Sequence, residues 1–247
     1  MIAFRSLLFN IYLYSWTIFI SVIGIILVPL PRRVFFAVLR IWAHGVTGGL
    51  RTICNIGMEV RGRENIPQGG ALVASKHQSM WDTIIYFSLV DDLAIVLKKE
   101  LSYIPLFGWL TIKTDMLHVD RAAGAKALKT LVAKAKRCVA NKRQIVIFPE
   151  GSRAPAGKSL NYKPGIAALY NQLGVPCVPV ALNSGICWPR HKFLRPPGCI
   201  IIEFLEPIAH GLKRKTFMAE LETRIESASA NLYLEGLTRL KSSADPS

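Results

Sequence analysis

A long apolar run opens the chain. Over Ser6–Pro31 no residue carries a charge, and most side chains are aliphatic or aromatic. About twenty apolar residues cross the hydrocarbon layer of a bilayer as a helix, so the length permits a span. A signal peptide has a shorter apolar segment and then small residues, whereas here Arg32 and Arg33 follow. The pattern predicts a retained membrane helix, with Tyr12, Tyr14 and Trp16 at the level of the headgroups.

The next stretch, Val34–Met58, has the pattern of an amphipathic helix. Polar and cationic side chains project from one stripe, and apolar side chains occupy the rest of its circumference. Such a helix lies in the membrane interface, with its apolar side toward the acyl chains and its arginines among the phosphates. The stripe is formed by Arg33, Arg40, His44, Thr47 and Arg51.

Pro29 and Pro31 interrupt the chain between these two predicted helices. Residues 1–57 are therefore expected to form an N-terminal membrane-anchoring helical hairpin. Its first helix either crosses the bilayer as a transmembrane helix or dips into one leaflet. The alternative is that both helices pack against the protein's own core.

After the hairpin, short runs rich in valine and isoleucine alternate with helical stretches, as in strands buried on both faces. This alternation predicts an α/β fold, a sheet covered by helices on both faces, with its chemistry in loops beyond the carboxyl ends of the strands. The domain is expected to span residues 58–240, before a frayed tail at 241–247. The predicted strands are Met58–Arg63, Ala71–Ser75, Leu93–Leu97, Met116–Val119, Gln144–Phe148, Cys177–Leu182 and Cys199–Leu205. The predicted helices are Trp81–Leu89, Ala122–Asn141, Pro164–Leu173 and Thr216–Leu234.

Composition adds an anionic partner to this picture. The formal net charge of +15 suits nucleic acid, an anionic membrane surface or a phosphorylated substrate. With 51% hydrophobic residues beside it, the membrane is favoured. The predicted helix Ala122–Asn141 is basic, and it forms either a solvated face or a surface that rests on anionic headgroups. Aromatic residues do not alternate with its lysines, which argues against a nucleic-acid-binding platform.

The five cysteines show no CxxC pair and no other metal-ligand spacing. Free, buried thiols in a reducing compartment are expected, with no disulfide and no metal site. These residues are Cys54, Cys138, Cys177, Cys187 and Cys199.

Reactive side chains follow the predicted strand Ala71–Ser75. On one continuous helix His77 and Asp82 would point about 140° apart, so they meet only if the chain turns between them. Ser79 suits the N-cap of a helix that begins after such a turn. The carboxylate can then fix the imidazole tautomer, and the other ring nitrogen can take a proton from a hydroxyl. A serine nucleophile of the GxSxG kind is missing, so the nucleophile is expected to come from the substrate.

Two further segments place cations where strands end. After the strand Gln144–Phe148, a turn presents Glu150, Gly151, Ser152 and Arg153, and the planar guanidinium suits a phosphate. Lys98 and Lys99 close the strand Leu93–Leu97, before an apolar stretch suited to an acyl tail. Taken alone, each segment also suits a structural role: a loop-capping histidine, an Arg–Glu surface pair or a solvated lysine pair.

Taken together, these segments resemble the four ordered motifs of the glycerolipid acyltransferase family, over roughly Glu59–Pro207. The likeness is greatest to the members that acylate lysophosphatidic acid. Ser152 departs from the usual threonine but keeps the hydroxyl. The matching segments are His77-Gln-Ser-Met-Trp-Asp82, Lys98-Lys-Glu-Leu with Ile104-Pro-Leu-Phe-Gly108, Phe148-Pro-Glu-Gly-Ser-Arg153 and Val178-Pro-Val180.

The resemblance implies a role for each position. His77 is expected to be the general base on the sn-2 hydroxyl, oriented by Asp82. Arg153, with Lys98 or Lys99, is expected to bind the phosphate of the acceptor. Glu150, Gly151 and Ser152 are expected to contribute to that substrate site, and Val178-Pro-Val180 to lie near the acyl donor.

The resemblance also implies the reaction and its partners. An acyl group passes from acyl-CoA or acyl-carrier protein to lysophosphatidic acid, giving phosphatidic acid in phospholipid biosynthesis, with no cofactor and no metal. The protein is expected at the inner membrane, on an anionic surface, with its catalytic domain on the cytoplasmic side. No nucleic-acid partner is expected.

Two alternatives stay open from the sequence. In the first, the acceptor is glycerol-3-phosphate or a lyso-ornithine lipid in place of lysophosphatidic acid, although an acceptor without phosphate leaves Arg153 unexplained. In the second, the chain is a non-catalytic basic membrane-binding protein, which needs the hairpin and the charge but not His77 and Asp82.

Overall fold

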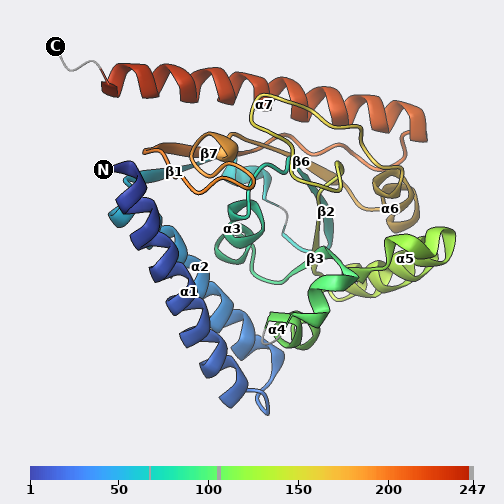
Figure 1. Cartoon of the computed structure of the whole chain (residues 1–247). Coiled ribbons are helices and arrows are strands. Elements are labelled where there is room, and N and C mark those ends of the chain that lie inside the picture. The colour runs from blue at the N-terminus through green and yellow to red at the C-terminus, as the bar shows by residue number, and fades with distance from the viewer. Residues whose placement is uncertain (67, 105–106, 245–247) are drawn as a thin grey trace.

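Short strands rich in β-branched residues form one seven-stranded sheet in the computed structural model of the chain (Figure 1). The structure describes residues 1–66, 68–104 and 107–244. The strand order is β1-β7-β6-β2-β5-β3-β4, and among these described strands the neighbours are parallel except for β6 and β7. The strands are β1 (Ile56–Arg61), β2 (Ala71–Ser75), β3 (Leu93–Lys98), β4 (Leu117–Val119), β5 (Gln144–Ile147), β6 (Cys177–Leu182) and β7 (Gly198–Phe204).

Helices cover both faces of this sheet, as predicted. Side chains alternate along β2, so that Val73 packs into the core beneath α2 and α3, whereas Leu72 and Ala74 pack beneath α5, α6 and α7. The helix α7 lies along one side of the molecule (Figure 1). The helices are α1 (Ile2–Ile26), α2 (Arg32–Cys54), α3 (Trp81–Leu89), α4 (Phe107–Lys113), α5 (Gly124–Ala140), α6 (Gly165–Leu173) and α7 (Arg214–Ala244).

The predicted elements differ from the observed ones mainly at their ends. Each predicted strand is present, with its bounds shifted by two residues at most, and β1 begins at Ile56, inside the range expected for the hairpin. The helix α7 continues to Ala244, so residues 241–244 are helical rather than part of a frayed tail; residues 245–247 lie outside the described residues. The helix α4 was not predicted.

The two N-terminal helices form the predicted hairpin, with both prolines in the connection between them (Figure 1). Two glycines of α2 admit the aromatic rings of α1. A Cβ at Gly45 would lie 2.2 Å from the ring of Trp16, and one at Gly49 would lie 2.3 Å from that of Tyr12. The Tyr12 hydroxyl also donates to the Gly45 carbonyl at 2.9 Å. These two aromatics therefore join the helices to each other, and their position at the headgroups stays a prediction.

The apolar side of α2 is covered by protein, which corrects the prediction of an interface helix with that side in lipid. Its buried residues pack against α1, α3 and the sheet, while Arg33, His44 and Arg51 of the polar stripe are exposed. A two-faced pattern shows that one side needs an apolar partner, but it does not distinguish lipid from a protein core. The buried side chains are Phe35, Phe36, Val38, Leu39, Ala43, Val46 and Leu50.

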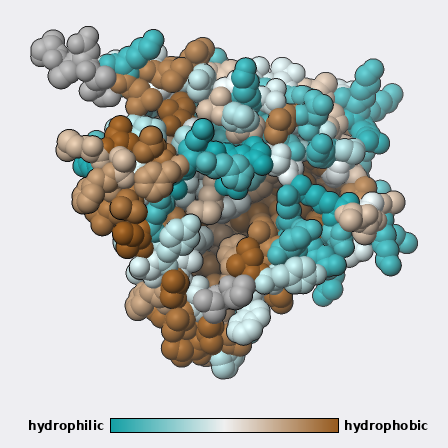
Figure 2. Space-filling view, in the orientation of Figure 1, coloured by the Kyte–Doolittle hydropathy of each residue, from teal (hydrophilic) through white to brown (hydrophobic). Residues whose placement is uncertain are grey.

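The apolar surface that stays open belongs mainly to α1. Figure 2 shows apolar side chains gathered over the hairpin and hydrophilic ones on the opposite side of the molecule. Of the helices in the described residues, α1 is the one long and apolar enough to cross a membrane. At helical spacing, its exposed residues form one face: Phe4, Leu7, Leu8, Ile11, Tyr14, Ile18, Val22 and Ile25.

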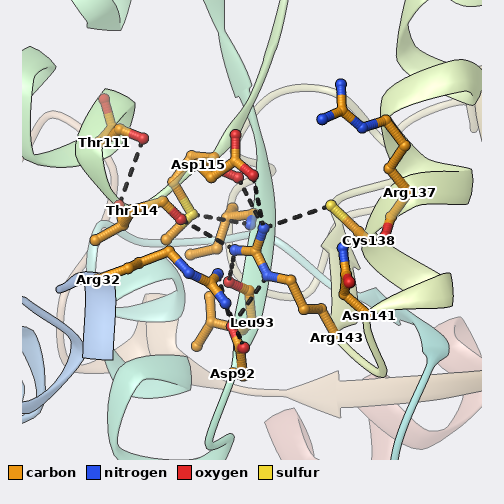
Figure 3. Close-up of polar contacts among 12 residues, drawn as sticks. Arg32, Asp92, Leu93, Thr111, Thr114, Asp115, Arg137, Cys138, Asn141 and Arg143 are labelled. Atoms are coloured by element: carbon orange, nitrogen blue, oxygen red, sulfur yellow. Dashed lines mark hydrogen bonds and ion pairs between the residues drawn. The ribbon is translucent and has the colours of Figure 1, made fainter.

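An arginine at the end of the sheet where β3 and β5 begin connects the hairpin to the domain (Figure 3). Arg143 is 2% exposed and donates to the carboxylate of Asp92 at 3.0 Å and to the Leu93 carbonyl at 2.8 Å. Asp92 also accepts two hydrogen bonds, of 3.0 and 2.7 Å, from Arg32 at the start of α2. The turn of the hairpin is therefore fixed at the edge of the sheet where β3 and β5 begin.

Candidate active site

The predicted functional residues meet at the opposite edge. Because β6, β2, β5, β3 and β4 run parallel, their carboxyl ends lie together. His77 follows β2, Lys98 ends β3, and Glu150–Arg153 follow β5. The loop after β6 contributes Ser184 to the same edge.

The turn between His77 and α3 brings the imidazole to Asp82. The N-cap of α3 is Met80, one residue after the predicted Ser79, and the Oγ of Ser79 accepts the Trp81 amide hydrogen at 2.9 Å. The Nδ1 of His77 lies 3.0 Å from the Oδ2 of Asp82, so the predicted contact is present. A carboxylate at this distance requires the hydrogen on Nδ1, which leaves Nε2 as the basic nitrogen. The imidazole is 15% exposed and the carboxylate 0%.

Four donors converge on the Asp82 carboxylate. Besides the imidazole, Oδ2 accepts from the amides of Gln78 at 2.6 Å and Ser79 at 2.8 Å. The other oxygen, Oδ1, accepts from the Ser184 hydroxyl at 2.5 Å. Ser184 is fully buried and lies far along the chain. The carboxylate is thus held in one orientation toward His77.

The segment after β5 packs directly on His77. The imidazole stacks on the Phe148 ring, with centroids 4.1 Å apart and planes 25° from parallel. The carbonyl of His77 accepts the Ala154 amide hydrogen at 2.7 Å, and its own amide donates to Glu150 at 3.2 Å. These contacts place the predicted phosphate motif beside the base.

Glu150 points inward rather than toward a substrate. Its buried carboxylate accepts from Lys76 Nζ at 2.7 Å, and Lys76 also binds Glu226 of α7 at 2.7 Å. The hydroxyl of Tyr162 donates to Glu226 at 2.9 Å. Burial raises the pKa of Glu150, and the ammonium of Lys76 opposes that shift. Glu150 is expected to contribute to the substrate site, and its buried contacts mean that it would do so by shaping the loop that carries Arg153.

Arg153 has the properties of an anion ligand. It is half-buried, and its guanidinium makes no hydrogen bond or ion pair within the described part of the chain. Burial and the positive charge of Arg190 lower its pKa, whereas the carboxylate of Asp82 raises it, so the guanidinium lies within electrostatic reach of the catalytic pair. A planar, unpaired guanidinium at such a place suits a phosphate.

The rest of the loop is shaped for close approach. Gly151 has a φ of +69°, a conformation that favours glycine, and its carbonyl accepts from Arg121 at 2.6 Å. Ser152 is partly exposed beside it.

The two predicted lysines differ in what they contact. Lys99 lies in a helical turn and pairs with Asp120 at 3.1 Å. Lys98 is exposed at the end of β3 and has no ion pair with a described residue. Lys98 is therefore the freer of the two to meet an anion. In the matched stretch Ile104–Gly108 that follows, residues 105 and 106 lie outside the described residues.

Several contributors were missed from the sequence. Ser184 carries a weak signal, because it follows a predicted strand at the catalytic edge. Lys76, Arg121 and Arg190 carry none, since their partners are known only from the packing of distant segments. Among the described residues, no group of three or more His, Cys, Asp or Glu side chains gathers as a metal site.

Comparisons with known proteins identify the family of the chain. The family model described as Acyltransferase matches residues 57–183. A 1-acyl-sn-glycerol-3-phosphate acyltransferase of Pseudomonas aeruginosa is 33% identical over 228 residues, covering 91% of this chain and 88% of that protein. The protein of the same name from Saccharomyces cerevisiae is 27% identical, covering 75% of this chain and 63% of that one.

The fold has a solved counterpart. The crystal structure of the 1-acyl-sn-glycerophosphate (LPA) acyltransferase from Thermotoga maritima matches with a TM-score of 0.80 and 24% sequence identity. The match covers 94% of this chain and 98% of that chain, so the N-terminal hairpin and the α/β domain are both included.

Proposed function

The chain belongs to the acyltransferase family, and from this premise we propose that it transfers a fatty acyl group to the sn-2 hydroxyl of lysophosphatidic acid, giving phosphatidic acid. The donor is acyl-CoA or acyl-carrier protein, and the reaction needs no metal or cofactor. One observation carries the proposal: the oriented pair of His77 and Asp82 lies against the segment that carries Arg153, whose half-buried guanidinium has no partner among the described residues.

The chemistry follows from the proton positions. The Nε2 of His77 takes the proton of the acceptor hydroxyl while the hydroxyl oxygen attacks the thioester carbonyl. The tetrahedral intermediate collapses, the C–S bond breaks, and the thiolate takes the proton back from the imidazolium. Asp82 stabilises the imidazolium between these steps and keeps its ring oriented. No covalent acyl-enzyme is required, because the acceptor itself is the nucleophile.

Binding of the acceptor rests on cations at the same edge. Arg153 holds the phosphate, and Lys98 is better placed than the Asp120-paired Lys99 to assist. Gly151 and Ser152 line the loop, and Val178-Pro-Val180 of β6 lies near the donor.

Membrane attachment follows from the exposed face of α1. Its apolar side chains suit the acyl region of a leaflet, and the basic surface of the domain suits anionic headgroups. We place the protein at the inner membrane, with the catalytic edge on the cytoplasmic side.

The test is a panel of acceptors. Purified full chain in micelles receives labelled acyl-CoA, or acyl-carrier protein, with lysophosphatidic acid, glycerol-3-phosphate or lyso-ornithine lipid. Phosphatidic acid labelled at the sn-2 position, formed faster than the other products, supports the proposal. A faster product from either other acceptor would replace the proposed substrate, and no product from any pair would favour a non-catalytic membrane-binding protein.

A further inference from the structure

The loop between β6 and β7 contacts both the catalytic edge and the hairpin. At one end, Arg190 donates from Nη1 to the carbonyl of Arg153 at 2.8 Å. Because β2 lies between β6 and β5 in the sheet, this bridge crosses the end of β2, where His77 follows. At its other end the loop is attached to α1.

Two guanidiniums thus share one side of the site. Arg190 is exposed, and its one hydrogen bond to a described residue goes to a backbone carbonyl rather than to a carboxylate. Arg153 makes no ion pair with a described residue, and burial, followed by the charge of Arg190, lowers the pKa of Arg153. Adjacent like charges are unfavourable unless an anion lies between them. A phosphate dianion removes that repulsion and can accept hydrogen bonds from both groups.

The attachment to α1 is made by Arg195, which is 7% exposed. Its amide donates to the Ser6 hydroxyl at 2.9 Å, and Nη2 donates to the side chain of Asn10 at 3.1 Å. The guanidinium lies over the Trp188 ring, 4.7 Å from its centroid. The loop is therefore fixed to the N-terminal half of the membrane helix.

The same arginine fixes the loop with two apolar side chains outward. Its Nη1 donates to the carbonyls of Phe193 at 2.6 Å and of Lys192 at 3.1 Å. Phe193 and Leu194 nevertheless remain 48% and 49% exposed. An ordered backbone that presents an apolar pair to solvent is typical of an interaction surface.

That surface continues the exposed face of α1. Leu7 and Tyr14, which belong to that face, lie one helical turn before and after Asn10, to which the loop is bonded. The apolar pair has cations at Arg190 and Lys192 and no acidic residue nearby in sequence. Apolar side chains flanked by cations fit a leaflet with anionic headgroups.

We propose that residues 188–195 form an entry loop for the phosphorylated acceptor. Phe193 and Leu194 insert into the leaflet, and Arg190 is the second cation of the phosphate clamp, beside Arg153. The inference rests on the proposed function, and it assigns to Arg190 the part that the family resemblance implies for Lys98 or Lys99.

The clamp is tested by equilibrium binding, which does not depend on turnover. Isothermal titration of the full chain with a short-chain lysophosphatidic acid below its micelle concentration is measured for wild type, Arg190→Ala, Arg190→Lys and Lys98→Ala. Loss of a hydrogen bond to a charged group predicts that Kd rises roughly ten- to hundredfold for Arg190→Ala. The Kd of Arg190→Lys is expected to lie between those of wild type and Arg190→Ala, because lysine keeps the charge but not the planar set of donors.

A charge-matched control is Arg214→Ala, at the exposed start of α7, whose Kd should equal that of wild type. An unchanged Kd for Arg190→Ala, or a larger rise for Lys98→Ala, overturns the assignment. Because binding is read directly, wild type that binds the lipid but forms no phosphatidic acid refutes the proposed function and leaves the clamp standing.

The leaflet contact is tested by hydrogen exchange. The amides of Phe193 and Leu194 donate no hydrogen bond to a described residue, so they exchange fast in detergent-free buffer. Phosphatidylglycerol-containing vesicles should slow exchange of the peptide 190–195 at least tenfold, and leave the peptide around the exposed Leu234 of α7 unchanged. Equal exchange with and without vesicles overturns the insertion of the loop.

Discussion

Removal of the Ser184 hydroxyl should slow catalysis without weakening binding of the acceptor. The hydroxyl donates to Oδ1 of Asp82 at 2.5 Å, and both residues are fully buried. A hydrogen bond to a charged group contributes roughly 1.5–3 kcal/mol, or about ten- to hundredfold in rate. Three donors to Oδ2 remain in Ser184→Ala, so its loss of rate should lie at the lower end of this range, with kcat reduced roughly ten- to thirtyfold.

The assay separates orientation of the base from damage to the fold. Initial rates are measured against the acceptor concentration, and KM should stay within about twofold because a fully buried hydroxyl touches no acceptor. Ser229→Ala is the matched control. Ser229 is 4% exposed on α7, and its Oγ has no hydrogen-bond partner in the described structure, so kcat should not change.

A Ser184→Ala enzyme with wild-type kcat would refute the reasoning that the hydroxyl orients Asp82. A rise in KM at constant kcat would contradict it as well, because Ser184 would then act on binding. A fall in kcat that Ser229→Ala shares would assign the effect to core packing instead.

Three further outcomes are expected. Arg143→Ala should lower the free energy of unfolding in urea by about 3–5 kcal/mol, because it leaves buried polar groups unpaired. The control is Arg137→Ala, at an exposed arginine of α5 (Figure 3), which should change the free energy of unfolding by less than about 0.5 kcal/mol. Equal losses in the two variants would contradict the role of Arg143. Hydrogen bonds from Arg61 lower the pKa values of Glu59 and Glu235, so the stability from these carboxylates is present above their usual pKa and lost as pH falls through the lowered values. Glu235→Gln should therefore lower Tm by about 1–4 °C at neutral pH and by less near pH 3, and a difference that grows in acid would oppose this sign. Ile18→Asp, on the exposed face of α1, should reduce flotation of the protein with vesicles while its Tm stays within about 2 °C of wild type. The control Leu234→Asp, on α7, should float like wild type. Equal flotation of all three proteins would exclude the face of α1 as the membrane contact.

Local patterns were sufficient for most of the fold. The strands of valine and isoleucine were located because burial on both faces leaves a continuous apolar run. The contact of His77 with Asp82 was predictable because it is set within five residues, by one turn before the start of α3. The pairing of strands and the antiparallel β7 depend on long-range packing, which the runs themselves do not encode.

The failures have a common physical cause. The amphipathic pattern of α2 showed an apolar side, but its partner is α3 and the sheet rather than lipid. The resemblance implied that Glu150 shapes the substrate pocket, but the contacts of its carboxylate with Lys76, and of Lys76 with Glu226 of α7, could not be read from the motif. Which cations are already paired is decided by such distant contacts, and this distinguishes Lys98 from Lys99 and places Arg190 beside Arg153.

The general-base role of His77 is tested by the rate of phosphatidic acid formation by wild type and by His77→Ala, with labelled acyl-CoA and lysophosphatidic acid in the same micelles. A general base contributes roughly 10²- to 10⁴-fold, so His77→Ala should lose that factor while its Kd for the acceptor stays within about twofold of wild type. Product formed by wild type and lost in the variant establishes the reaction together with its base. A His77→Ala rate near that of wild type would contradict the central claim.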